Sequence, residues 1–239
     1  MDSDSTFLTA EWRDLAMLNY EVEPSLLRPF VPVGTELDSW NGRTFVSLVG
    51  FRFLNTVVRG IPIPFHRNFD EVNLRFYVRR FEGAELRRGV VFIREVVPRW
   101  AIAAVARTVY GENYVALPMR HSIERSGFEI DVKYGWRTAS GWAQISLQSK
   151  GRAEVAAENS EEQFITEHYW GYARQRDGST AEYRVAHPAW RVWQGKDASF
   201  EGDVNKLYGE TLAGVLSGKP CSAFLAEGSE VTVFRGRRL

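Results

Sequence analysis

The chain is poor in cysteine and in lysine, and both shortages restrict its chemistry. Cys221 is the only cysteine, so no intrachain disulfide can form, and a reducing compartment fits this chain best. Of the 30 basic residues, 25 are arginine and 5 are lysine, and no lysine precedes Lys133. A site built from the first half of the chain therefore has no lysine amine.

Long apolar runs and an excess of charge are also missing. No run of about 18 uncharged apolar residues occurs, which excludes a membrane-spanning helix. The 30 acidic residues balance the 30 basic ones, so no overall field favours nucleic acid or a membrane surface as a partner. The N-terminal residues MDSDSTFLTAEW are acidic and lack the apolar core of a secretory signal. We therefore expect a soluble cytoplasmic protein.

The motifs that mark common enzyme classes are absent as well. The sequence has no GxGxxG after a strand, no P-loop and no GxSxG nucleophile elbow. It has no HExxH, no HxxxH and no ligand cluster that contains cysteine, so a dedicated metal site is not expected. We expect neither a metal nor a cofactor.

Apolar and aromatic residues are plentiful enough for a large core. The chain has 239 residues, 44% hydrophobic and 13% aromatic, without repeats or long linkers, so we predict one domain over residues 1–239. Many segments follow strand period and few follow helix period, which predicts a mostly β fold, an antiparallel barrel or sandwich. Asn41-Gly42 predicts a hairpin between strands at 37–40 and 43–54. The other predicted strands are 15–22, 71–81, 89–97, 128–136, 142–149, more than one strand around 183–193, and an edge strand at 230–235. The predicted helices are 24–30, 98–110, 161–170 and 203–216.

The stretch FHRNFDEVNLRFYVRR, residues 65–80, divides its side chains between two faces of a strand. One face is an apolar row. The other is polar, and it is either a solvated outer face or the lining of a polar cavity. The functional interpretation depends on which of these is right. The apolar row is Val72, Leu74, Phe76 and Val78, and the polar row is Glu71, Asn73, Arg75, Tyr77 and Arg79.

Several segments taken together resemble one protein family. They are WRDLAMLNYEVEP, LLRPFVPVGTELDSWNG, VSLVGFRF, PFHRNFDEVNLRFYV and YGENYVALPMR. In their order and spacing they are similar to the DUF2071 or YqjF-like family of the acetoacetate-decarboxylase-like superfamily, over residues 11–234. The resemblance implies a closed or cone-shaped antiparallel β-barrel with a buried cavity and short flanking helices.

The decarboxylases of that superfamily, as the resemblance implies, use a lysine that forms a Schiff base with a β-keto acid, beside a glutamate and an arginine. Laid along this chain, their pattern places the arginine at Arg13, the glutamate at Glu71 and the lysine at Tyr114. A phenol cannot condense with a ketone. Lys133 and Lys150 are predicted to lie on an outward row and at a strand end. Schiff-base decarboxylation is therefore not expected, whereas a cavity with an acid and a cation is.

Glu71 and Arg13 are the predicted catalytic residues. If Glu71 faces a cavity, burial raises its pKa unless Arg13 or Arg75 pairs with it, and it then serves as a general acid or base. A buried ion pair is the alternative. The planar guanidinium of Arg13 is suited to grip a substrate carboxylate, and a salt bridge with Asp14 or Glu71 is its alternative role.

Substrate binding is predicted for four further polar residues of this region. Tyr114 can donate to an oxyanion and Asn113 can orient a carbonyl or a water molecule, although both also suit a plain polar loop. Asn73 and Tyr77 share the polar row with Glu71 and would line the same cavity.

Two histidines complete the predicted binding set. His66 lies in a proline-rich loop shortly before Glu71, and His121 ends the segment that contains Tyr114. Each is interpreted either as a proton carrier or as a structural side chain.

These residues predict a cavity for a small organic acid or ketone. As an enzyme, the protein would be a lyase or hydratase that acts on a small organic or keto acid by acid–base catalysis, without an imine. The alternative is a non-catalytic ligand-binding or sensing module, and a purely structural domain with a filled barrel is a third interpretation. Tryptophan and arginine are common at interfaces, so a homo-oligomer is a further expectation.

Overall fold

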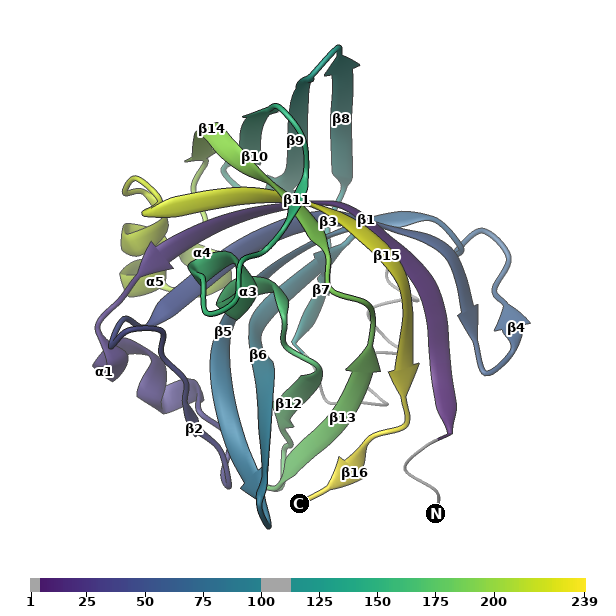
Figure 1. The fold of residues 1–239 in the computed structure, drawn as a ribbon, viewed down its shortest axis with the longest axis vertical. Helices are drawn as coiled ribbons and strands as arrows, with labels where there is room; N and C mark the ends of the chain where they lie inside the picture. The colour runs from purple at the N-terminus through teal and green to yellow at the C-terminus, as the bar shows by residue number, and fades with distance from the viewer. Residues whose placement is uncertain (1–4, 100–112) are drawn as a thin grey trace.

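The computed structural model describes residues 5–99 and 113–239 of the chain. Within these ranges long strands dominate, and the helices are few and short (Figure 1). No helix there has the length and apolar composition needed to cross a bilayer. The strands are β1 (Thr6–Glu21), β2 (Glu36–Leu37), β3 (Phe45–Val58), β4 (Ile61–Pro62), β5 (Phe69–Glu82), β6 (Glu85–Val97), β7 (Tyr114–Ala116), β8 (Met119–Ser126), β9 (Glu129–Thr138), β10 (Gly141–Lys150), β11 (Glu154–Val155), β12 (Trp170–Arg174), β13 (Thr180–Ala186), β14 (Arg191–Glu201), β15 (Ser222–Phe234) and β16 (Arg237–Arg238), and the helices are α1 (Pro24–Leu27), the 3-10 helix η1 (Arg28–Phe30), α3 (Glu161–Thr166), α4 (Asn205–Tyr208) and α5 (Glu210–Leu216).

The main sheet closes into a ring. The order of its strands is β13, β12, β6, β5, β3, β1 and β15, and β13 pairs with β15 as well as with β12. Neighbours in the ring are antiparallel except β12 and β6, which run parallel where Trp170 lies beside Gly89. The predicted mostly β, barrel-like fold with few short helices is confirmed, and the parallel pair is a departure from a wholly antiparallel arrangement.

A second layer of strands continues from the ring. β14 pairs with β15, and beyond it lie β10, β9 and β8, which project from the ring at the top of Figure 1. The predicted strands at 128–136 and 142–149 are confirmed as the antiparallel pair β9 and β10.

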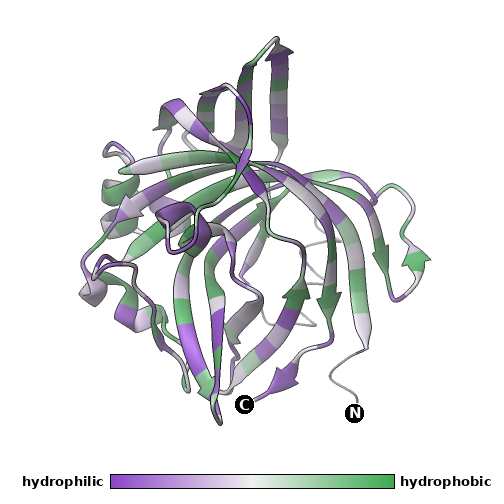
Figure 2. Cartoon of the chain, viewed as in Figure 1, coloured by the Kyte–Doolittle hydropathy of each residue, from purple (hydrophilic) through white to green (hydrophobic). Residues whose placement is uncertain are grey.

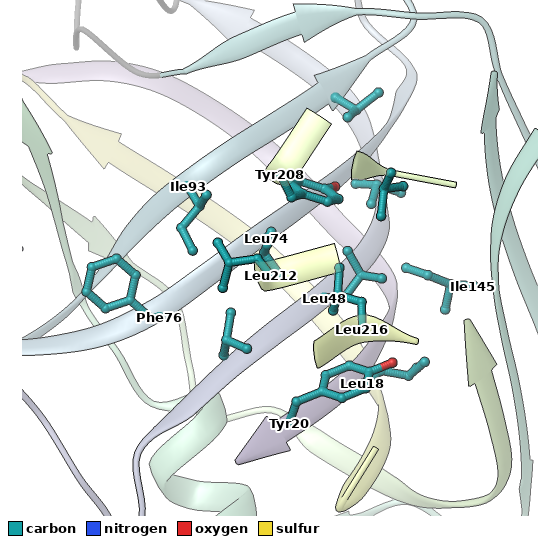
Figure 3. Close-up of a cluster of buried hydrophobic side chains, with 14 of the residues drawn as sticks. Leu18, Tyr20, Leu48, Leu74, Phe76, Ile93, Ile145, Tyr208, Leu212 and Leu216 are labelled. Atoms are coloured by element: carbon teal, nitrogen blue, oxygen red, sulfur yellow. The ribbon is translucent and has the colours of Figure 1, made fainter. Parts of the chain in front are cut away.

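The apolar row of β5 packs between the ring and this outer layer. Val72, Leu74 and Phe76 are completely buried, in a cluster that also contains Ile145 of β10 and Leu212 of α5 (Figure 3). Each such side chain stabilises the fold by about 1.5–3 kcal/mol when fully buried. Figure 2 shows the apolar and polar bands that alternate along the ring strands. Since successive side chains of a strand point to opposite faces, the polar row of β5 must face the interior of the ring.

Helix α3 fills one end of that interior. It begins after Ser160, whose Oγ accepts a hydrogen bond from the Gln163 backbone N–H at 3.1 Å. Phe164 and Ile165 are buried inside the ring, and the Phe164 ring lies 5.2 Å from the ring of Tyr77. The open space inside the ring therefore lies beyond α3.

A β-bulge in β1 decides which of its side chains enter that space. Asp14 has φ +57°, and the register with β3 shifts between Arg13 and Ala16. As a result Trp12 and Leu15 both line the interior although they are three residues apart. The Arg13 side chain points to the outer face of the ring.

Three local predictions differ from the structure or lie outside it. Asn41-Gly42 makes a tight turn, but only the bridge between Trp40 and Arg43 forms across it, and β2 pairs with β5 instead. The predicted edge strand at 230–235 is part of β15, which pairs with β1 along most of its length and is not an edge. The predicted helix at 98–110 falls almost entirely outside the described residues.

Candidate active site

A largely aromatic cavity lies inside the ring. Its volume is about 260 Å³, and residues of β1, β3, β5, β6, β7, β12, β13 and β15 line it. Most lining side chains are apolar, so a polar group in this space is poorly solvated. The large aromatic side chains of the wall include Trp12, Phe51, Phe53, Phe92, Trp170 and Trp190.

Glu71 is a buried acidic group of this cavity. It is 2% exposed. The Asn73 amide Nδ2 donates to its Oε1 at 3.0 Å, and the Tyr114 hydroxyl donates to its Oε2 at 3.1 Å. Burial raises the pKa of Glu71 to about 7, against the opposing effects of these hydrogen bonds and of the Arg75 charge. At neutral pH the carboxyl group is therefore poised to release or accept a proton.

Strand register brings the neighbours of Glu71 together. Asn73 of β5 lies opposite Glu95 of β6, and Glu95 lies beside Tyr114 of the parallel strand β7. Burial, together with the Glu71 and Glu95 carboxylates, raises the pKa of Tyr114 well above its usual range. The phenol thus keeps its proton and acts as a hydrogen-bond donor. We call Glu71, Asn73, Glu95 and Tyr114 the acidic cluster.

A second polar group lies where the cavity meets the end of α3. Arg75 is 8% exposed, and its Nη2 donates to the Ile165 carbonyl oxygen at 3.1 Å. His168, which follows α3, is 7% exposed and also lines the cavity. Burial and the Arg75 charge hold the pKa of His168 well below its usual range, so its imidazole is neutral.

Arg13 does not reach the cavity, which corrects the prediction that it would be the cation beside Glu71. Its guanidinium pairs with Glu11, with Nη2 and Oε2 2.8 Å apart, and also donates to the Gly228 carbonyl oxygen. The bulge at Asp14 lets Trp12 and Leu15 both face the cavity and leaves the Arg13 side chain on the outer face of the ring. Arg75 is the cation that the described structure places in the cavity.

Of the four predicted binding residues on or next to strands, two line the cavity and two do not. Asn73 and Tyr114 line the cavity. Tyr77 does not line it, because it lies further along β5 under Phe164, where its hydroxyl is 2.6 Å from the Ser47 Oγ. Asn113 is exposed, and its Nδ2 donates to the Ile93 carbonyl oxygen at 3.3 Å, which ties the start of β7 to β6.

Of the two predicted histidines, one lines the cavity. His66 is part of the lining, and its Nδ1 lies 2.8 Å from the Pro64 carbonyl oxygen. His121 lies on the outer face, with its Nδ1 2.9 Å from Oδ2 of Asp70. Since Asp70 and Glu71 are adjacent in β5, their side chains point to opposite faces, and His121 cannot contact Glu71.

Sequence reasoning gave Glu95 and His168 no role. Glu95 enters the acidic cluster through its pairing with Asn73, which is long-range in sequence. His168 follows a short helix that packs inside the ring, and no local pattern marks it. Within the described ranges, no three His, Cys, Asp or Glu side chains are grouped so that they could hold a metal ion.

All five lysines lie at the surface. Lys133, Lys150, Lys196, Lys206 and Lys219 are each exposed. A lysine that forms a Schiff base needs a lowered amine pKa, which requires a desolvated or cationic setting. None of these lysines is desolvated. The cavity carries the phenol of Tyr114 beside the Glu71 carboxylate.

Comparison with known proteins agrees with this fold. The family DUF2071, described as an uncharacterized conserved protein, matches residues 9–230. The uncharacterized protein YqjF of Bacillus subtilis (strain 168) is 30% identical over 198 residues, which cover 82% of this chain and 78% of that protein.

Solved structures with the same fold include enzymes. Acetoacetate decarboxylase from Legionella pneumophila superposes with a TM-score of 0.70 at 15% identity, over 100% of this chain and 90% of that one. The enduracididine biosynthesis enzyme MppR complexed with pyruvate superposes with a TM-score of 0.67 at 14% identity, over 100% of this chain and 91% of that one. At these identities the similarity establishes the fold.

Proposed function

The chain belongs to the DUF2071 family, and from its cavity we propose that it is an enzyme that acts on a small organic or keto acid by acid–base catalysis, without an imine. The reaction is of lyase or hydratase type. The observation that carries this proposal is Glu71, a buried carboxyl group with a pKa of about 7 inside a largely apolar cavity.

The elementary step is the transfer of a proton between Glu71 and a carbon next to the carbonyl group of the ligand. The Glu71 carboxylate takes the proton, and the electron pair of the broken C–H bond moves to give an enolate whose charge lies on the carbonyl oxygen. The Asn73 amide donates one N–H to Glu71 and has a second N–H, which suits that oxygen. Return of the proton, or loss of a leaving group from the neighbouring carbon, completes an exchange or an elimination.

The structural relatives support the choice of substrate. One is an acetoacetate decarboxylase, and another is complexed with pyruvate, so this fold accommodates keto acids in those proteins. In the present chain the cavity offers a carboxyl group and a phenol, and the lysines are exposed. Chemistry that depends on a proton carrier suits this cavity, and chemistry that depends on an amine does not.

Deuterium exchange tests this proposal directly. The protein is incubated in D2O with a panel of keto acids, and NMR measures the incorporation of deuterium next to the carbonyl group. We expect exchange with at least one acid of the panel, and a loss of about 100-fold or more in its rate in Glu71→Gln. Glu227→Gln, which removes an exposed carboxylate of β15, is the matched control and should exchange at the wild-type rate.

Two results would count against the proposal. One is an exchange rate that is unchanged in Glu71→Gln. The other is a wild-type protein that binds a keto acid but exchanges none of the panel, which would identify a ligand-binding module instead of an enzyme.

A further inference from the structure

The acidic cluster is not the whole of the polar lining. Arg75 and His168 lie at the end of the cavity next to α3, and the proposed proton transfer uses neither of them. Along β5, the Cα atoms of Glu71 and Arg75 are about 13 Å apart, at about 3.3 Å per residue. A ligand that contacts both Glu71 and Arg75 therefore extends along the cavity.

The guanidinium of Arg75 retains hydrogen-bonding capacity. Its Nη2 donates to the Ile165 carbonyl oxygen, which fastens the end of α3. In the described part of the chain the Glu71 carboxylate accepts hydrogen bonds from Asn73 and Tyr114, and Arg75 forms no ion pair with it. The Arg75 Nε is buried and has no hydrogen-bond partner among residues 5–99 and 113–239.

His168 also has buried nitrogens without hydrogen-bond partners among the described residues. Both of its ring nitrogens are buried, and neither has a hydrogen-bond partner in the described part of the chain. Its ring lies 4.7 Å from the ring of Tyr77, and the Arg75 guanidinium lies 5.7 Å from that same ring. Buried polar atoms are normally hydrogen-bonded, so nitrogens without partners on two neighbouring side chains that line one cavity indicate a place for a ligand.

The size and lining of the cavity limit what that ligand is. An apolar cavity of about 150 Å³ is enough to hold benzene. The volume of about 260 Å³ exceeds this, and the wall contains Phe51, Phe53 and Phe92. An acid of three or four carbons would leave much of this aromatic surface without contact. A ring that carries a short acidic side chain would cover it.

We propose that Arg75 and His168 bind the carboxylate of an organic acid whose body is one aromatic ring or an apolar group of similar size. A guanidinium and an imidazole N–H are both donors that suit a carboxylate, and the guanidinium adds opposite charge. This inference rests on the proposed function, because the acidic cluster supplies the group that reacts with the same ligand.

Binding measurements with two probes test the inference. Isothermal titration calorimetry compares 3-phenylpropanoate with its neutral amide, 3-phenylpropanamide. We expect wild type to bind the acid at least tenfold more tightly than the amide. Arg75→Gln should weaken binding of the acid at least tenfold and leave binding of the amide within twofold. His168→Ala should weaken binding of the acid by a smaller factor, and Arg13→Gln, an arginine outside the cavity, should change neither affinity.

The amide also reports on folding, since a variant that still binds it has kept its cavity. If Arg75→Gln does not fold, Arg75→Lys keeps the charge without the planar fork and should still weaken binding of the acid. Equal affinities of wild type for acid and amide, no binding of either probe, or equal weakening of both by Arg75→Gln would overturn the inference. Glu71→Gln separates it from the proposed function, because this variant should lose deuterium exchange and keep its affinity for 3-phenylpropanoate.

Discussion

Replacing Glu71 with Gln should remove the contribution of this carboxyl group to the dependence of stability on pH. In the folded protein burial raises the pKa of Glu71 from 4.5 to about 7. Between these values the folded state holds a proton that the unfolded chain has released, so the free energy of unfolding of the wild type falls as pH rises. At about 1.4 kcal/mol for each pH unit, this interval corresponds to about 3 kcal/mol.

Urea unfolding at pH 4, 6 and 8 measures the effect. The other titrating groups are common to both proteins, so the difference in unfolding free energy between Glu71→Gln and wild type reports the titration of Glu71 together with its effect on the groups around it. That difference should shift in favour of the variant by about 3 kcal/mol between pH 4 and pH 8. Glu227→Gln, which alters an exposed side chain, should show almost no such shift. A difference that stays constant across the pH range would refute the assignment of a buried, proton-holding carboxyl group at position 71.

Three further predictions follow from the site and the fold. The rate of deuterium exchange in wild type should rise with pH through about 7, as Glu71 becomes a carboxylate, and a pH–rate profile by NMR checks this. Borohydride treatment with keto acids should leave no adduct on any lysine, because all five are exposed; an adduct found by mass spectrometry would contradict the imine-free mechanism. Gly228→Ala should destabilise the protein by at least about 2 kcal/mol in urea unfolding, because φ is +78° and the added Cβ would lie 1.9 Å from the Trp12 carbonyl oxygen; an unchanged midpoint would contradict this.

The division of β5 into an apolar and a polar face could be predicted from the sequence, because it depends only on residues within the strand. Strand period separates Val72, Leu74 and Phe76 from Glu71 and Asn73 without reference to the rest of the chain. Alternation does not say which face meets solvent. The structure answers this through long-range packing: the outer layer and α5 cover the apolar face, and closure of the ring encloses the polar one.

Long-range strand pairing and a single backbone irregularity account for the differences between the sequence-based predictions and the structure. Asn41-Gly42 specifies a turn, but the strand before it pairs with β5 instead of across the turn. The left-handed conformation of Asp14 is a one-residue event that no periodic pattern signals, and it leaves Arg13 outside. Arg75 takes the place expected for Arg13, because it shares the inward row of β5 with Glu71.

The surface position of every lysine has a practical consequence. Coupling reagents that react with lysine amines will attach at the outside of the protein and spare the aromatic interior. The protein can therefore be immobilised on a resin through its lysines with its binding space intact. Passing cell extract over that resin, and eluting with denaturant for mass spectrometry, offers a direct route to the natural ligand.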